Sequence, residues 1–101
     1  MKIVWADPAI KDLKSIQEFI AKDSEYYAIE FIQRIIASVE SLEKFPDLGR
    51  IVPEANNKHI RELLYQTYRI IYRTENNVQI LAIIHGSRNL TQTKPSRWEI
   101  I

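Results

Sequence analysis

The stretch YRIIYRTENNVQILAIIH, residues 68–85, decides the fold of this chain. Residues 68–73 and 78–85 are rich in β-branched and aromatic side chains, which favour strands. The polar segment Glu75-Asn76-Asn77 between them is typical of a tight turn. Because two strands with so short a connection pair as a hairpin, the stretch predicts two neighbouring antiparallel strands.

The chain just before this hairpin predicts further strands of the same sheet. Residues 59–65 have a strand-like composition, and Gln66-Thr67 forms the turn that follows them. A shorter extended piece at residues 50–52 comes before a polar loop, residues 53–58. The β-like run at residues 1–5 is expected to join the sheet from the other end of the chain.

Two amphipathic helices are predicted ahead of these strands. Asp7-Pro8 supplies an N-cap and a proline at the first helical position, and apolar residues then recur at steps of three and four to about Ala21. Ser24 caps a second, more apolar helix that ends before residues 45–49. Two helices joined by so short a break form an antiparallel hairpin, and their shared apolar stripe needs a surface to cover.

Together these elements predict an α+β fold. We expect an antiparallel β-sheet with an N-terminal two-helix hairpin packed on one face, in the order β-α-α-β-β-β. A chain of 101 residues supports one hydrophobic core, so residues 1–101 are expected to form a single domain. Residues 89–101 contain Pro95 and lack periodicity, which predicts an irregular C-terminal arm.

Composition argues against several classes of protein. The chain has no cysteine, so it has no disulfide, no thiolate zinc site and no cysteine nucleophile. His59 and His85 lie far apart without spaced carboxylates, so we expect neither a metal site nor a cofactor. An acid at Asp7 interrupts any signal-peptide stretch, and no apolar run approaches the roughly 18 residues of a membrane span. The sequence therefore predicts a cytoplasmic protein without a membrane partner.

Charge is unevenly distributed along the chain. Residues 1–58 hold eight Lys/Arg and ten Asp/Glu, a balance of −2, whereas residues 59–101 hold six and three, a balance of +3. Most arginines lie in the second half, and arginine is the better group for bidentate contacts with phosphates or carboxylates. This pattern favours an anionic partner for the second half, although a merely solvated basic half would show it too.

Strand alternation sorts the side chains of the predicted sheet by face. Arg69 lies opposite to its neighbours Tyr68 and Ile70, while for residues 59–65 alternation alone does not choose a face. In the last strand the side predicted to lie under the helices is Val78, Ile80, Ala82 and Ile84, and the uncovered side is Gln79, Leu81, Ile83 and His85.

The most economical arrangement gathers basic side chains on the uncovered face. It places Arg61, Arg69 and His85 there, with Arg88 at the rim, over a floor of Ile71, Leu81 and Ile83. Converging guanidinium groups on an apolar floor would bind phosphates or a partner's carboxylates. Two plainer alternatives remain open: the arginine stems can simply cover apolar surface, and His85 can be a satisfied residue at a strand end.

Four motifs occur in an order and spacing that resembles the RelE/ParE toxin superfamily. They are PDLGRIVPE at residues 46–54, IREL at residues 60–63, YRIIYR at residues 68–73 and IHGSR at residues 84–88. With the leading strand and helices, the resemblance covers nearly the whole chain. It implies a helical hairpin on an antiparallel sheet, and a cognate antitoxin whose partly disordered segment folds on the toxin.

The resemblance also implies a choice between two targets. RelE-like members cut messenger RNA in the ribosomal A site, and ParE-like members poison DNA gyrase without being nucleases. For cleavage, Glu54 matches a carboxylate base, and Arg61, Arg69 and Arg88 match arginines that offset charge on the phosphate. The terminal Tyr or His-Tyr of nuclease relatives is absent, so His85 or Trp98 would have to replace it. The resemblance favours cleavage and leaves two alternatives open: gyrase inhibition, or an inactive or purely regulatory relative.

Overall fold

The computed structural model describes residues 1–86 of the chain. Its elements are β1 (Ile3–Trp5), α1 (Asp7–Ala21), α2 (Glu25–Glu40), a short 3-10 turn (Ser41–Glu43), β2 (Arg50–Ile51), β3 (Ile60–Tyr65), β4 (Tyr68–Thr74) and β5 (Val78–His85). The predicted α+β fold is confirmed. The predicted arm at residues 89–101, which contains Trp98, lies outside the described residues, and so does Arg88, predicted at the rim of the sheet.

The strands form a five-stranded sheet in the order β1-β5-β4-β3-β2. Strands β2 to β5 pair antiparallel, as expected, whereas β1 runs parallel to β5 and makes the sheet mixed. The extended piece at residues 50–52 becomes the short edge strand β2, which adds one strand to the predicted order. A hairpin turn places Gln66 at a φ of 51°, in the left-handed region.

The two helices begin differently. Ser24 is the N-cap of α2, and its side-chain oxygen accepts a hydrogen bond from the Tyr27 amide at 3.1 Å, as predicted. The N-cap of α1 is Ala6, not Asp7, and no side chain caps that end. Asp7 lies inside the first turn, where its negative charge suits the positive end of the helix dipole.

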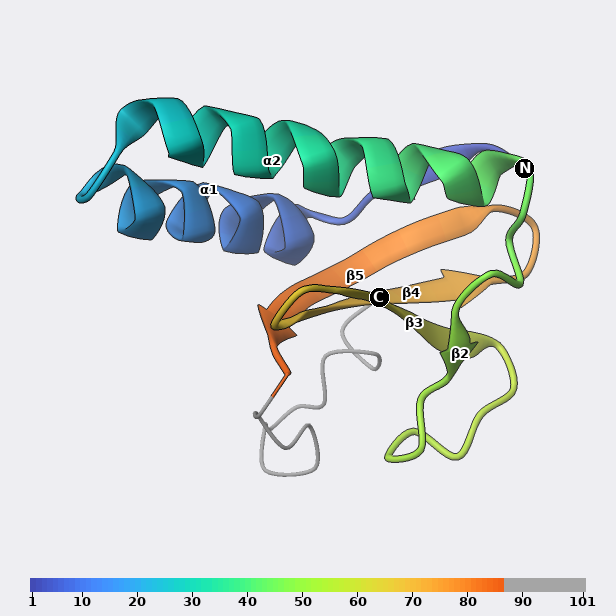
Figure 1. Ribbon diagram of the computed structural model, residues 1–101. Coiled ribbons are helices and arrows are strands. Elements are labelled where there is room, and N and C mark those ends of the chain that lie inside the picture. Colours follow the sequence, from blue (N-terminus) through green and yellow to red (C-terminus); the bar gives the residue numbers. More distant parts are fainter. Residues whose placement is uncertain (87–101) are drawn as a thin grey trace.

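The helical hairpin covers one face of the sheet as a separate layer (Figure 1). Its buried stripe packs on side chains from β4 and β5, and Tyr72 is fully buried within this core. The principal apolar members of this core are Ala9, Ile16, Phe31, Ile32, Ile35, Val39, Leu42, Ile70, Val78, Ile80 and Ile83. Burial of this shared stripe explains why two helices of ordinary length are stable here.

The opposite face of the sheet carries a second, smaller core. It consists of Val52, Ile60, Ile71, Leu81, Ala82 and Ile84, with Ala55 packed against it. Ile71 and Leu81 are fully buried, so the predicted open floor is instead a packed surface. Chain that follows β2 contributes Val52 and Ala55 to this packing.

A register shift between β4 and β5 explains why alternation misplaced part of the last strand. Ile71 pairs with Ala82 but the next residue, Tyr72, pairs with Ile80, so Leu81 is an extra residue in β5. An extra residue exchanges the two faces for everything beyond it. The predictions that Ala82 and Ile84 lie under the helices and that Ile83 lies on the other face were therefore wrong.

Helix α1 is tied directly to the edge of β5. Strand β1 pairs with β5 only from Val78 to Ile80, so the edge of β5 extends past the end of β1. There the Asp12 carboxylate accepts a hydrogen bond from the Ile83 amide at 2.9 Å. A side chain thus satisfies a strand-edge group that would otherwise be a pairing site.

No helix among residues 1–86 combines the length and the apolar character that crossing a membrane would require.

Candidate functional site

A groove of about 490 Å³ opens beside the β3–β4 turn and the end of β5. The side chains that matter to its chemistry are Arg50, Glu54, Leu64, Tyr68, Arg69 and His85. They come from β2, from the loop at residues 52–59 and from three strands. The groove therefore lies where segments distant in sequence meet, which is typical of a binding site.

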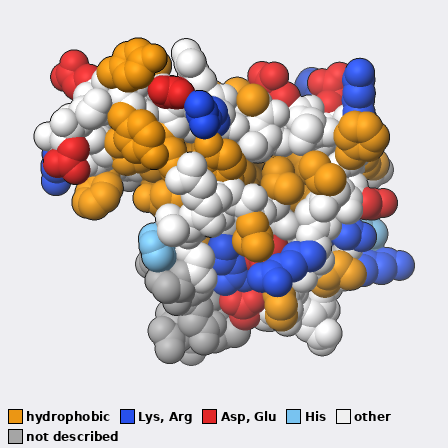
Figure 2. All heavy atoms as spheres, in the orientation of Figure 1, with side chains coloured by type: hydrophobic (Ala, Val, Ile, Leu, Met, Phe, Trp, Pro, Cys, Tyr) orange, Lys and Arg blue, Asp and Glu red, His pale blue; other side chains and the backbone are white. Residues whose placement is uncertain are grey.

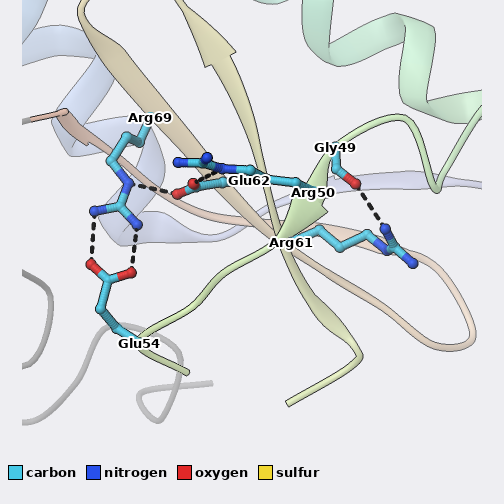
Figure 3. Close-up of polar contacts among 6 residues, drawn as sticks. All are labelled: Gly49, Arg50, Glu54, Arg61, Glu62 and Arg69. Carbon is cyan, nitrogen blue, oxygen red and sulfur yellow. Dashed lines mark hydrogen bonds and ion pairs between the residues drawn. The ribbon is translucent and has the colours of Figure 1, made fainter. Parts of the chain in front are cut away.

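Arg69 is the centre of a hydrogen-bonded ion-pair network on this side of the sheet. Its two terminal nitrogens donate to the two carboxylate oxygens of Glu54, each at 2.9 Å (Figure 3). Its Nε donates to Glu62 at 2.5 Å, and the other oxygen of Glu62 accepts from Arg50 Nε at 2.5 Å. A bidentate guanidinium–carboxylate pair is among the strongest polar contacts in proteins.

The network is partly buried and its charges cancel. Glu62 is 1% exposed and Arg69 is 6% exposed, so neither charge could be held there without a partner. The pKa of Arg69 is raised above its usual value, chiefly by the hydrogen bond to Glu54. Burial acts in the opposite direction, and the hydrogen bond to Glu62 raises the pKa further. Two arginines and two glutamates together carry no net charge.

Arg61 lies on the other face of the sheet, and the prediction that it joins Arg69 was wrong. In β3 it pairs with Tyr72, whose side chain belongs to the core under the helices. Figure 3 shows Arg61 pointing away from Arg69, and its Nη1 donates to the Gly49 carbonyl at 2.8 Å. Its Nε lies 3.5 Å from Asp47. Alternation left this strand undecided, and packing of Leu63 against the helices resolves it.

His85 shares the side of Tyr68, not the side of Arg69. Tyr68 in β4 pairs with His85 in β5, and their rings meet edge to face with centroids 5.8 Å apart. The predicted placement beside Arg69 on one face was therefore wrong, because the extra residue Leu81 reverses the faces. The end of the strand nevertheless brings His85 to the groove that Glu54 and Arg69 also line.

Glu62 and Arg50 are functional candidates that alternation of basic residues did not single out. Glu62 lies between Ile60 and Leu64 on one face of β3, and Ile60 is fully buried. A carboxylate that alternates with apolar residues in a strand is the signal for a buried ion pair. Figure 2 shows the result at the surface: Lys and Arg side chains gather beneath the helical layer with acidic side chains directly beside them.

Among residues 1–86, no cluster of three or more His, Asp or Glu side chains is arranged to hold a metal ion.

The fold is that of a small α+β protein with a helical hairpin on a five-stranded sheet, and comparison with known families identifies its class. Residues 3–90 match the model of the family described as the ParE toxin of the type II toxin–antitoxin system, parDE. The chain belongs to this family, within the RelE/ParE superfamily of toxins.

Individual relatives are consistent with that membership. A Sinorhizobium fredii protein named "Putative toxin Y4kP" is 31% identical over 93 residues, which cover 90% of this chain and 94% of the relative. Toxin RelE2 of Caulobacter vibrioides is 28% identical, over 86% of this chain and 97% of its own. The fold is similar to a solved chain of the chromosomal ParDE system of P. aeruginosa, with a TM-score of 0.71, 22% identity and coverage of 84% and 95%.

Proposed function

We propose that this protein is the growth-inhibiting toxin of a type II toxin–antitoxin pair, acting in the cytoplasm and neutralised by a cognate antitoxin protein. Membership of the ParE toxin family supports this proposal, and so do the toxin names of two relatives that align over most of their length. The antitoxin is expected to wrap the toxin with a segment that folds on binding.

We further propose that the toxin cleaves messenger RNA on the ribosome. One observation carries this proposal: Glu54, Arg69 and His85 line the same groove. A carboxylate, a guanidinium and an imidazole in one groove are the groups that a 2′-hydroxyl attack on the adjacent phosphate requires.

In this scheme each side chain has one task. Glu54 takes the proton from the 2′-hydroxyl, whose oxygen attacks phosphorus and forms a 2′,3′-cyclic phosphate. Arg69 offsets the charge that builds on the phosphate oxygens. His85 gives a proton to the departing 5′-oxygen. Arg88 would add a further cation, and Arg61, which holds the turn before β2, has no part in the chemistry.

Gyrase inhibition without nuclease activity is the second candidate function. Its specific support is that Glu54 and Glu62 already pair with Arg69, and that the family model is named for the toxin of parDE. A network without net charge attracts the phosphates of nucleic acid less than a basic face would. In this mode Glu54 and Arg69 would be structural residues.

The test is to induce the protein without its antitoxin and to follow growth, transcript integrity and DNA breaks. Arg69→Lys keeps the positive charge near Glu62 but removes the pair of terminal guanidinium nitrogens that bind an oxyanion through two parallel hydrogen bonds. It is therefore a milder change than Arg69→Ala. Arg34→Lys is the matched control, because Arg34 lies exposed on α2, is not part of the groove, and contacts Glu30 and Tyr65.

The outcomes separate the candidates. Transcript cleavage that Arg69→Lys abolishes and Arg34→Lys retains would support the ribonuclease. Intact transcripts together with gyrase-dependent DNA breaks would replace it with the second candidate. Normal growth on induction of the protein alone would remove both.

A further inference from the structure

The guanidinium group of Arg69 has a divided geometry. Its Nε is turned toward Glu62 inside the protein, while both terminal nitrogens are turned toward Glu54 (Figure 3). A guanidinium fork binds one planar or tetrahedral oxyanion through two parallel hydrogen bonds. Glu54 occupies that position, so a phosphate cannot reach the end of the fork while the carboxylate stays there.

Glu62 fixes the orientation of the Arg69 guanidinium by accepting a hydrogen bond from its Nε. Its carboxylate is buried in the middle of β3, between its strand partners Arg50 and Ile71. One oxygen accepts from Arg69 and the other from Arg50, so the orientation of Arg69 does not depend on Glu54 alone. The fork would remain directed at the groove if Glu54 left it.

Glu54 is the member of the network that can leave. It belongs to the loop at residues 52–59 rather than to a strand, and its side chain is 21% exposed, against 0% for the Glu62 side chain. A partly exposed carboxylate on a loop loses little packing when it moves into water, whereas a buried carboxylate in a strand would leave its partners unsatisfied.

We infer that Glu54 is an exchangeable internal ligand, which occupies a phosphate-binding site formed by Arg69 and Glu62 until a phosphate of an RNA strand displaces it. This inference rests on the proposed ribonuclease function. Exchange at the fork couples two events: the phosphate binds to Arg69, and the released Glu54 carboxylate becomes available as the base that the reaction needs.

The lining of the groove favours an RNA phosphate over a carboxylate of a protein partner. Tyr68 and His85 line the groove that contains the fork, and their rings pack edge to face on each other. Aromatic rings offer stacking surfaces to unpaired bases, and single-stranded nucleic acid is commonly bound by stacking together with phosphate contacts. An acidic peptide would use the fork but would have no use for these ring faces.

The exchange has a measurable consequence for the affinity of the site. When a site is occupied internally, the apparent dissociation constant rises by the inverse of the fraction of molecules in which it is open. Glu54→Gln removes the competing charge without changing the size of the side chain. We expect inorganic phosphate to bind Glu54→Gln about tenfold more tightly than the unmodified protein. This ratio corresponds to a site that is open in about one molecule in ten of the unmodified protein.

The experiment titrates the folded full-length chain with inorganic phosphate and follows the Arg69 Nε–H signal and the amides of residues 52–59 by NMR. Glu54→Ala is a second variant that also removes the competitor. Glu40→Gln is the matched control, because it removes one negative charge at an exposed position on α2. A non-cleavable 2′-O-methyl RNA oligonucleotide and an acidic peptide are then compared on the Glu54→Gln variant.

Tighter phosphate binding by both Glu54 variants, unchanged binding by Glu40→Gln and preference for the RNA would support the inference. Equal affinity in all proteins, or preference for the acidic peptide, would overturn it. Growth arrest on induction is a separate readout. Exchange of Glu54 for phosphate without growth arrest would contradict the proposed function but would still support the phosphate-binding site.

Discussion

The hydroxyl group of Tyr72 lies 2.8 Å from the backbone nitrogen of Gly49 and accepts its hydrogen bond. The same hydroxyl donates to the Pro46 carbonyl at 2.8 Å. A buried side chain of β4 thus satisfies two backbone groups of the turn that leads into β2. Because Arg61 binds the Gly49 carbonyl from β3, two neighbouring strands hold this turn and set where β2 and Arg50 begin.

Tyr72→Phe should destabilise the fold without changing its shape. The substitution removes both hydrogen bonds and leaves the Gly49 amide and the Pro46 carbonyl without this partner. Loss of the shared hydroxyl is expected to lower the free energy of unfolding by about 1–3 kcal/mol. Urea denaturation measures the loss, and Tyr26→Phe, at an exposed position of α2, should change the midpoint little. Equal midpoints for both variants would contradict the role of the hydroxyl.

The same side chain predicts how stability depends on alkaline pH. Burial raises the pKa of Tyr72 above its ordinary value of 10.0. A group whose pKa is raised in the folded state stabilises the fold fully below the pKa of the unfolded chain, and this contribution is lost as pH rises toward the folded pKa. The unmodified protein should therefore lose stability more steeply than Tyr72→Phe above about pH 10. Unfolding measured from about pH 9 to pH 11 tests this, and parallel curves would refute it.

Sequence pattern was sufficient for the helices, the strands and the fold class, because the periodicity of the helices and the composition of the strands are local properties, but it did not predict that β1 runs parallel to β5. The end of α1 and the whole of β5 follow from residues within a few positions of each other. Which side chains share a face is not local. It depends on the register between β4 and β5, and the single extra residue Leu81 exchanges the faces for Ile83 and His85. Nothing in residues 78–85 alone marks which residue is the extra one.

The candidate site was predictable only as a set of residue types. Glu54 and Arg69 are 15 positions apart and His85 follows 16 positions later, and the groove does bring them together. The ion pairing between Glu54 and Arg69 was not predictable, because a loop carboxylate gives no sign of where its side chain points. Where the sequence predicted an open basic face, the structure has a network of paired charges.

Gly49→Ala should be more damaging than its exposed neighbourhood suggests. A Cβ at this position would lie 2.4 Å from the Glu62 carbonyl oxygen, a backbone atom of β3 that cannot simply turn aside. The turn must therefore move away from β3, and a cost of about 1–3 kcal/mol is expected, as for other overpacked sites. Gly86→Ala is the comparison, since its nearest backbone contact would be at 3.1 Å. Thermal unfolding should rank Gly49→Ala well below Gly86→Ala, and the reverse order would count against this packing.

Arg61→Lys and Arg69→Lys should separate stability from toxicity. Arg61 binds the Gly49 carbonyl on the face away from the groove, so its substitution is expected to cost about 0.5–1.5 kcal/mol and to leave growth arrest intact. Arg69→Lys loses the fork that faces Glu54 and is expected to abolish arrest while remaining folded. Growth after induction, normalised to the amount of folded protein, measures both. Loss of arrest in folded Arg61→Lys would return that arginine to the functional site.

Asp12→Ala should loosen the edge of β5 where β1 has ended. The carboxylate accepts the Ile83 amide, and without it that amide faces solvent or an unsatisfied space beside α1. We expect hydrogen exchange at Ile83 to accelerate by about tenfold or more, corresponding to roughly 1.4 kcal/mol of local stability. Lys11→Ala, at an exposed position of the same helix, provides the control. Because the effect is confined to one strand edge, the Ile80 amide, which lies where β1 still pairs with β5, should keep its protection. Uniform acceleration along β5 would show instead that Asp12 stabilises the whole sheet.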